Sequence, residues 1–307
     1  MIPSLAAFGR QMTAIKRLIF VAACLLAVGC GAIVQVAYNN SGFALRMMAD
    51  DYFDLNDEQE RYLEQPLADF HDWHRREELP IYARMFAGAA ERIRRGLMPE
   101  DVTWAFGEVR ERYRVLTLRA IEETAPLLAK LEAENLKALE AKLAENNAKF
   151  AKEYPLDKPE KQDRARTRRL EAGLRHFLGD LTEEQHALAT RFVQSQPRMT
   201  LARLDYRRQR QREIIELLQQ YRSASDLVPR LRNYFLGWQR DPESERARET
   251  REWEDRFAAF ILDLDRSLTA QQRRHAVQKF TSYADDCRVL ARQGPSARER
   301  AELETDR

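Results

Sequence analysis

The sequence predicts an all-α protein, built as an elongated multi-helix bundle of antiparallel helical hairpins. Leu, Ala, Glu, Arg and Gln dominate the composition, and these residues favour helices. Apolar side chains recur at helical spacing along almost the whole chain after Gly42, and no sustained alternation of Val, Ile and Thr indicates a strand. The resulting apolar stripes need partners, which neighbouring antiparallel helices supply.

The periodicity predicts helices in a fixed order along the chain, over residues 43–53, 57–78, 81–95, 100–118, 121–152, 163–178, 183–195, 199–222, 224–238, 243–265 and 270–292. Proline cannot continue a helix interior, and four prolines mark expected boundaries: Pro80, Pro99, Pro197 and Pro242. The segment Glu153–Pro159 has the composition of a linker or hairpin loop, and the helical domain would subdivide near 153–162.

One expected helix carries a seven-residue repeat. Leu136, Leu143 and Phe150 recur at this interval within 121–152, while polar residues occupy the alternate positions of the seam. The pattern favours an apolar stripe inside a bundle over a dimeric coiled coil.

The start of the chain indicates export. Lys16 and Arg17 precede eleven uncharged residues, 18–28, which match a secretory apolar region and are too short to span a bilayer. Small residues then lead to Cys30. The segment resembles the signal peptide and lipobox of a bacterial lipoprotein. An ordinary secretory signal or an uncleaved anchor is the alternative, and translation begins at either Met1 or Met12.

The lipobox resemblance implies a division of the chain. Residues 1–29 would be removed as the signal peptide, and Cys30 would carry fatty acyl chains, palmitate among them, that anchor the protein in the membrane. Because Gly31 rather than aspartate follows the cysteine, the usual sorting rule implies the outer membrane, with the domain facing the periplasm. Residues 30–41 would form the lipidated tether, 42–293 the helical domain and 294–307 a polar tail.

Charge and cysteine content agree with export. The removed residues contain Arg10, Lys16 and Arg17 and no acid, so the formal charge falls from +2 to −1. A near-neutral exported chain is a poor candidate for nucleic-acid binding. Cys24 is lost with the signal peptide and Cys30 is lipidated, which leaves Cys287 without an intramolecular partner and predicts a buried, apolar role for it.

One local pattern occurs three times, at 55–59, 181–185 and 268–272. Each copy reads as a capping box, in which a polar side chain accepts a backbone N–H at the helix start and a glutamine three residues later reaches back to the cap. The predicted cap residues are Asn56 with Gln59, Thr182 with Gln185, and Thr269 with Gln272.

These repeats carry a first family resemblance. The L-T-x-x-Q pattern resembles a signature of the Spy/CpxP family of periplasmic helical chaperones and stress regulators, and this implies a chaperone or an envelope-stress sensor. The match spans five residues per copy, and a purely structural role as helix caps is the alternative.

A second resemblance is broader. It rests on Tyr38-Asn39-Asn40, on Asp51-Tyr52-Phe53-Asp54-Leu55 through Gln59, and on Trp73 through Tyr82. These stretches resemble a family of Gram-negative lipoproteins that is known only as a domain of unknown function. The resemblance implies a helical envelope lipoprotein and supplies no catalytic residues.

His71 and His74 lie three residues apart and share a helix face, so they form a candidate metal pair. A zinc site needs further ligands, and no HExxH motif or Cys/His cluster supplies them. We therefore expect a packed or solvent-facing pair, with no metal and no cofactor. Trp73 and its charged neighbours are an alternative conformational lock near a kink at Leu79-Pro80.

Two arginine clusters are candidate sites for an anionic partner: Arg164, Arg166, Arg168, Arg169 and Arg175, followed by Arg207, Arg208, Arg210 and Arg212. Arginine suits bidentate contact with phosphate or carboxylate, so a lipid phosphate, a cell-wall polymer or an acidic protein would fit. The alternative is a solvated helix face. Trp104, Trp238 and Trp253 are expected in the core, and an exposed one beside arginines would indicate an interaction site.

No nucleophile elbow, phosphate-binding glycine loop or clustered carboxylate motif indicates an enzyme. The sequence therefore predicts a non-enzymatic, membrane-anchored periplasmic lipoprotein that acts as an interaction or scaffold module for an envelope protein partner. The alternatives are an LTxxQ-type chaperone or stress sensor, and a protein that binds anionic lipid or cell-wall polymer. The sequence does not specify an oligomeric state.

Overall fold

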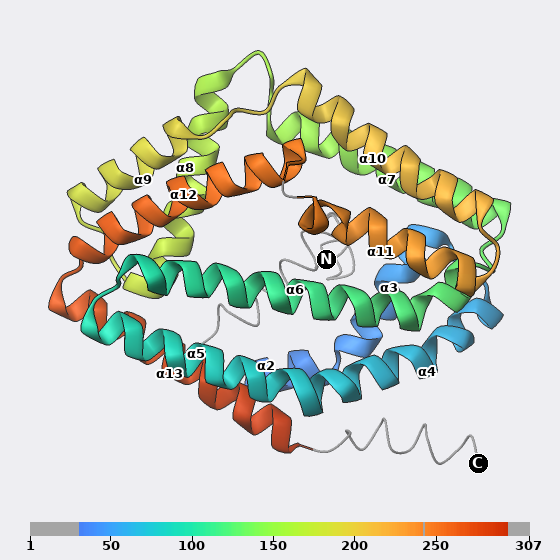
Figure 1. Ribbon diagram of the computed structural model, residues 1–307, viewed down its shortest axis with the longest axis horizontal. Coiled ribbons are helices and arrows are strands. Elements are labelled where there is room, and N and C mark those ends of the chain that lie inside the picture. Colours follow the sequence, from blue (N-terminus) through green and yellow to red (C-terminus); the bar gives the residue numbers. More distant parts are fainter. Residues whose placement is uncertain (1–30, 242, 294–307) are drawn as a thin grey trace, which may run out of the picture.

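The computed structural model describes residues 31–241 and 243–293. These residues are helical almost throughout and contain no strand, which confirms the predicted all-α multi-helix bundle (Figure 1). The expectations for the signal peptide, Cys30, Pro242 and the polar tail fall outside the described residues. The helical elements are α2 (Gly31–Asn39), α3 (Ser41–Phe53), α4 (Asp57–Trp73), η2 (His74–Glu78), α5 (Leu79–Arg95), α6 (Pro99–Leu128), α7 (Ala133–Glu153), α8 (Pro159–Leu178), α9 (Glu183–Ser195), α10 (Leu201–Gln220), α11 (Ala224–Arg240), α12 (Glu245–Arg266) and α13 (Ala270–Arg292).

Helix pairs lie along the outline of the molecule in Figure 1. α5 and α13 lie side by side along one edge, although they are far apart in the sequence. α7 pairs with α10 along a second edge, and α8, α9 and α12 form the region drawn at the upper left. α6 and α11 cross the middle. The bundle therefore joins helices that are distant in sequence.

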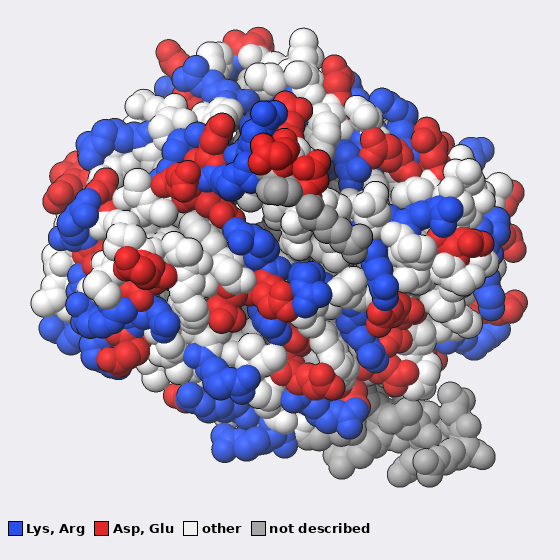
Figure 2. All heavy atoms as spheres, in the orientation of Figure 1, with Lys and Arg blue, Asp and Glu red and all other residues white. Residues whose placement is uncertain are grey.

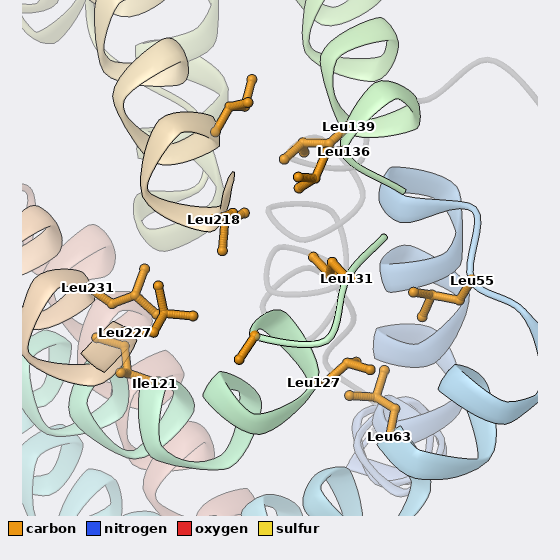
Figure 3. Close-up of a cluster of buried hydrophobic side chains, with 12 residues drawn as sticks. Leu55, Leu63, Ile121, Leu127, Leu131, Leu136, Leu139, Leu218, Leu227 and Leu231 are labelled. Carbon is orange, nitrogen blue, oxygen red and sulfur yellow. The ribbon is translucent and has the colours of Figure 1, made fainter. Parts of the chain in front are cut away.

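Three clusters of buried side chains hold these helices together. The largest joins α4, α6, α7, α10 and α11, and its leucines point toward one another in Figure 3. Leu131, Leu227 and Leu231 are almost fully buried there, and each such side chain contributes about 1.5–3 kcal/mol. A second cluster joins α2, α5 and α13, and a third joins α8, α9, α12 and α13.

The expected helix over 121–152 is wrong at its start. α6 continues through Pro126 to Leu128, and a short turn separates it from α7. The turn is stable because the Leu131 side chain is fully buried and the Asn135 Oδ1 accepts the Glu132 N–H at 2.8 Å, which caps α7. The leucine stripe of α7 packs inside the bundle, against α3 and α10.

The expected break at Pro80 is also wrong. α4 continues into α5 through the π-helical turn η2, in which the Leu79 N–H donates to the His74 carbonyl five residues back. Pro80 lies in the first turn of α5, where a missing N–H is tolerated. The chain therefore stays helical from α4 through η2 into α5, and the helix changes direction between α4 and α5 (Figure 1).

Residues 30–41 were expected to form a tether, but the described part of this segment is folded. Residues 31–39 form α2, and Val34 and Tyr38 of this helix are buried against α5 and α13. Because Val34 and Tyr38 are four residues apart, they lie on the same face of α2, and this face packs against the bundle. The expected loop over 153–159, in contrast, is confirmed between α7 and α8.

Candidate functional site: an apolar groove bordered by arginines

The described residues form a groove of about 770 Å³. It runs along α8 and is closed by α9, α12 and α13, with the loops at 154–158 and 196–200 at one end. Its volume lies within the range of roughly 300–1,000 Å³ that is typical of small-molecule sites.

Apolar and aromatic side chains form the walls. Phe257 of α12 lies between Trp253 and Phe192, with ring centroids 4.9 and 5.7 Å away. On the opposite side Phe177 of α8 stacks on Phe280 of α13 at 5.3 Å. Phe177, Phe192 and Phe257 belong to the partly buried rim of the third core cluster, and all five rings line the groove.

A glycine keeps the groove open. Gly173 lies on α8 and lines the groove, and a Cβ placed on it would meet no atom within 4 Å. Glycine in a helix interior costs about 0.5–1 kcal/mol relative to alanine. The helix therefore carries a destabilising residue at the position where a side chain would project into the groove.

Arginines border the groove. Arg166 and Arg169 come from α8 and Arg203 from α10. The Arg166 Nη1 is buried without a hydrogen-bond partner, and its nearest carboxylate oxygen, on Asp163, lies at 3.9 Å. Burial lowers the pKa of the Arg166 guanidinium below its ordinary value, and Asp163 opposes this change. The Arg166 side chain is 22% exposed through its other atoms, and a guanidinium can bind a phosphate or carboxylate through its accessible N–H groups.

The other polar side chains of the groove are occupied within the protein. Asp265 accepts hydrogen bonds from the Arg273 guanidinium at 2.8 Å and from the Leu97 N–H at 3.0 Å. Gln162, which is almost fully buried, donates to the Pro155 carbonyl and accepts the Met199 N–H, so it joins the two loops at the end of the groove. Arg169 is also engaged, since it donates to the Tyr154 hydroxyl and to Glu153, and Arg203 lies 3.7 Å from Glu249. Arg166 is therefore the least paired polar side chain of the lining.

The structure separates the arginines that the sequence groups together. Arg166 and Arg169 reach the groove, whereas Arg164 and Arg168 are exposed and Arg175 pairs with Glu171. Figure 2 shows basic and acidic side chains interspersed over the described residues of one face, without a broad basic area.

The arginines of α10 serve mainly contacts within the chain. Arg207 donates to the Asn147 Oδ1 and lies over the Phe150 ring, while Arg210 donates to the Tyr234 carbonyl and stacks on its ring at 3.7 Å. Arg208 pairs with Asp205, and Arg212 is exposed. The two clusters approach each other at one point, because Arg169 lies over Tyr154 and Arg207 over Phe150, and these two rings are 4.8 Å apart.

The structure forms all three predicted capping boxes. Asn56, Thr182 and Thr269 each accept the backbone N–H of the glutamine three residues later, and each glutamine accepts the cap N–H in return. Gln185 and Gln272 also bind each other, with their amides exchanging hydrogen bonds of 2.9 and 2.8 Å. The α9 and α13 starts are thereby locked together beneath the groove.

Gln59 has an equivalent partner that the sequence analysis missed. Its amide exchanges hydrogen bonds of 2.9 and 3.2 Å with Asn135, which caps α7 in the same way. The segment 131–135 is therefore a fourth helix-start motif, with asparagine in place of glutamine. Leucine at the first position of all four motifs is the signal that identifies it.

The candidate histidine pair contacts α2. The His71 Nε2 lies 3.1 Å from the Tyr38 carbonyl, and the His74 Nδ1 lies 2.9 Å from the Tyr38 hydroxyl. Burial, together with the nearby His71 and Arg75, lowers the pKa of His74 to about 4. Among the described residues, no group of three His, Cys, Asp or Glu side chains is placed to hold a metal ion.

The π turn η2 buries some of the charged residues that follow this pair and leaves others exposed. Arg75 and Glu78 are buried, and Glu78 accepts two hydrogen bonds from Arg112, at 2.9 and 3.2 Å. Arg76 and Glu77 are exposed. Trp73 lies beneath the Arg119 guanidinium, 5.6 Å from it. The buried pair stabilises the joint between α4 and α5, where the sequence analysis expected a kink.

The remaining candidates have mixed outcomes. Cys287 is buried in the second core cluster, as predicted, and burial raises the pKa of its thiol to about 12. Trp104 packs under Arg92, but Trp253 is 42% exposed because it lines the groove. No helix in the described part of the chain is both long and apolar enough to cross a membrane.

Fold and groove together define an all-α protein with a ligand-sized apolar groove. The chain belongs to DUF6279, a family of unknown function, whose family model matches residues 51–236. The match covers α8 and α9 of the groove and stops before α12. No curated protein and no solved structure matches the chain.

Proposed function

We propose that the protein is a lipid-anchored outer-membrane lipoprotein that faces the periplasm and acts as a non-catalytic binding module. Its ligand is an amphiphile with one apolar chain and an anionic head, which the groove along α8 binds. The groove is the observation that supports this proposal. The Cys30 anchor rests on the lipobox-like sequence.

The chemistry of the lining supports this ligand class. Burial of an acyl chain against the aromatic and aliphatic walls would stabilise the complex by about 25 cal/mol per Å² of apolar surface removed from water. The positive charge of the arginines at the rim complements a phosphate or carboxylate. The Arg166 side chain lines the groove and is 22% exposed, although its Nη1 is itself buried. The bound amphiphile would place its head near Arg166 and its chain beside Phe257.

The lining also supports a non-catalytic role. None of the groove residues is a serine, threonine, cysteine or histidine, and its carboxylate, on Asp265, is paired with Arg273. General acid–base or nucleophilic catalysis needs such side chains in an accessible position. The LTxxQ glutamines are likewise engaged in caps and in contacts between helices, so the chaperone alternative gains no exposed motif residues.

The anchor is tested by labelling cells with an alkynyl fatty acid. We expect label on the wild-type protein, none on Cys30→Ser, and undiminished label on the matched control Cys24→Ser. Unlabelled wild-type protein would contradict the anchor, and loss of label in Cys24→Ser alone would place the modification at the other cysteine.

The groove is tested with the full-length protein in vesicles and a photoreactive, clickable lysophosphatidic acid. We expect cross-links on α8, α9 and α12. They should be strongly reduced in Gly173→Leu, which fills the groove, and in Arg166→Gln. Gly107→Leu is the matched control, because Gly107 lies on α6 and also has open space around its Cβ position. Equal cross-linking in Gly173→Leu and Gly107→Leu would contradict the proposed site.

A further inference from the structure

The outward face of the first helices is apolar. The Asn40 N–H donates to the Val36 carbonyl at 3.1 Å and the Ala44 N–H to the Asn40 carbonyl at 3.2 Å, so helical hydrogen bonding continues from α2 into α3. Within 34–53 the exposed positions are 36, 40, 43 and 47, the spacing of one helix stripe. Val36, Phe43 and Met47 are 63, 51 and 52% exposed; we call these three residues the apolar stripe.

The apolar stripe is held outward because the other face of α2 is fixed. Tyr38 is buried, and the Arg75 guanidinium lies 5.1 Å from its ring centroid. Arg75 also donates to the Asn39 Oδ1 at 2.9 Å and to the Leu290 carbonyl at 3.2 Å. Rotation of α2 to hide Val36 would break the contacts of Arg75 with Tyr38 and Asn39.

Aligned exposure of this kind indicates a binding surface. Scattered exposed apolar residues are ordinary in soluble proteins, but a contiguous patch marks contact with a protein or a membrane. Three of the four exposed positions within 34–53 are the large apolar residues of the apolar stripe, and the fourth is the uncharged Asn40. A solvated helix face would carry charged residues instead.

We propose that the apolar stripe lies in the interface of the lipid bilayer, beside the anchor. This inference rests on the proposed lipidation of Cys30. α2 begins at Gly31, the next residue, and is already docked by Val34, so the body has little freedom to move away from the membrane. At 1.5 Å per residue, Val36 is about 8 Å and Met47 about 24 Å along the helix from Gly31.

A helix that lies in the membrane plane brings the whole stripe to the lipid. Interfacial helices bury their apolar face about 5–10 Å into the boundary between head groups and acyl chains. The Arg46 guanidinium lies 5.6 Å from the Phe43 ring centroid, beside the stripe, where a cationic head can remain in the aqueous layer. The lipid anchor and the apolar stripe would then fix the orientation of the domain on the membrane.

The test uses the full-length protein in vesicles of phosphatidylethanolamine and phosphatidylglycerol. Phe43→Cys and Met47→Cys are labelled with bimane, and a lipid that carries a nitroxide near its head group is the quencher. Val109→Cys and Leu201→Cys are matched controls, because Val109 and Leu201 are 60 and 66% exposed on α6 and α10. The buried Cys287 should remain unlabelled. We expect quenching that is several-fold stronger at positions 43 and 47 than at 109 and 201.

Two results would overturn the proposal. Equal quenching at all four positions would show that the apolar stripe faces away from lipid. A disulfide that forms between two copies of the Phe43→Cys variant, with weak quenching, would assign the stripe to self-association instead. Failure of the anchor is recognised separately, because an unmodified Cys30 in the wild-type protein would itself take up bimane.

Discussion

Replacement of Gln185 by methionine should destabilise the protein by about 3 kcal/mol. Gln185 is fully buried, and its amide bonds the Thr182 N–H, the Ser267 carbonyl and Gln272. Methionine keeps most of the volume but none of these hydrogen bonds. The lost half of the capping box costs about 1 kcal/mol, and the buried polar groups left without partners cost about 1–3 kcal/mol.

The free energy of unfolding in urea measures this effect. Gln219→Met is the matched control, because Gln219 is exposed on α10, and should change the free energy by less than about 0.5 kcal/mol. Gln272→Met should cost as much as Gln185→Met. The double variant should cost less than the sum of the two by about 1–2 kcal/mol, because each single variant leaves the other amide unpaired. Additive losses, or single losses below those of the control, would refute the proposed amide pair.

Three further predictions concern single residues. The pKa of His74 is about 4 in the folded protein, against an ordinary value of 6.5 in the unfolded chain. Between these pH values the unfolded chain binds more protons than the folded protein. The free energy of unfolding should therefore fall by roughly 3 kcal/mol at most as the pH is lowered from 6.5 to 4. His74→Phe should flatten this slope in urea titrations at stepped pH, and an unchanged slope would contradict the assignment. Gly173→Ala should raise the free energy of unfolding by about 0.5–1 kcal/mol, since its Cβ enters open space; a loss would show that the groove closes in solution. Cys287 should react with thiol reagents only after unfolding, because the thiol is buried with a raised pKa, and fast labelling of the native protein would contradict its burial.

The helix caps could be predicted from sequence because capping is local. Thr182 and Gln185 lie within one turn, so their residue types and spacing determine the hydrogen bonds. The pairing of Gln185 with Gln272, 87 residues away, depends on how the helices pack. The motif at 131–135 was missed because asparagine stands where the other copies have glutamine.

Tertiary contacts overrode local signals at two places. Pro80 is a strong helix-breaking signal, but the π turn before it and the buried ion pair of Glu78 with Arg112 keep the helix continuous. Residues 31–39 have a tether-like position in the chain, but Tyr38 supplies enough contact to dock them as a helix. Neither contact is visible in the surrounding sequence.

The groove could be predicted only in fragments. The arginine cluster on α8 was identified, but sequence spacing could not separate Arg166, which borders the groove, from Arg164, which is exposed. The aromatic walls come from α8, α9, α12 and α13, and only the fold brings them together. Gly173 resembles any helix glycine until its surroundings are known.

The most direct test of the proposed binding module is mass spectrometry of the lipids that remain on the full-length protein after purification from its own membrane. We predict close to one anionic amphiphile per chain in the wild-type protein and in Gly107→Leu, and a large loss in Gly173→Leu. The absence of such a molecule from the wild-type protein, or its undiminished presence in Gly173→Leu, would contradict the proposal that the groove along α8 is the binding site.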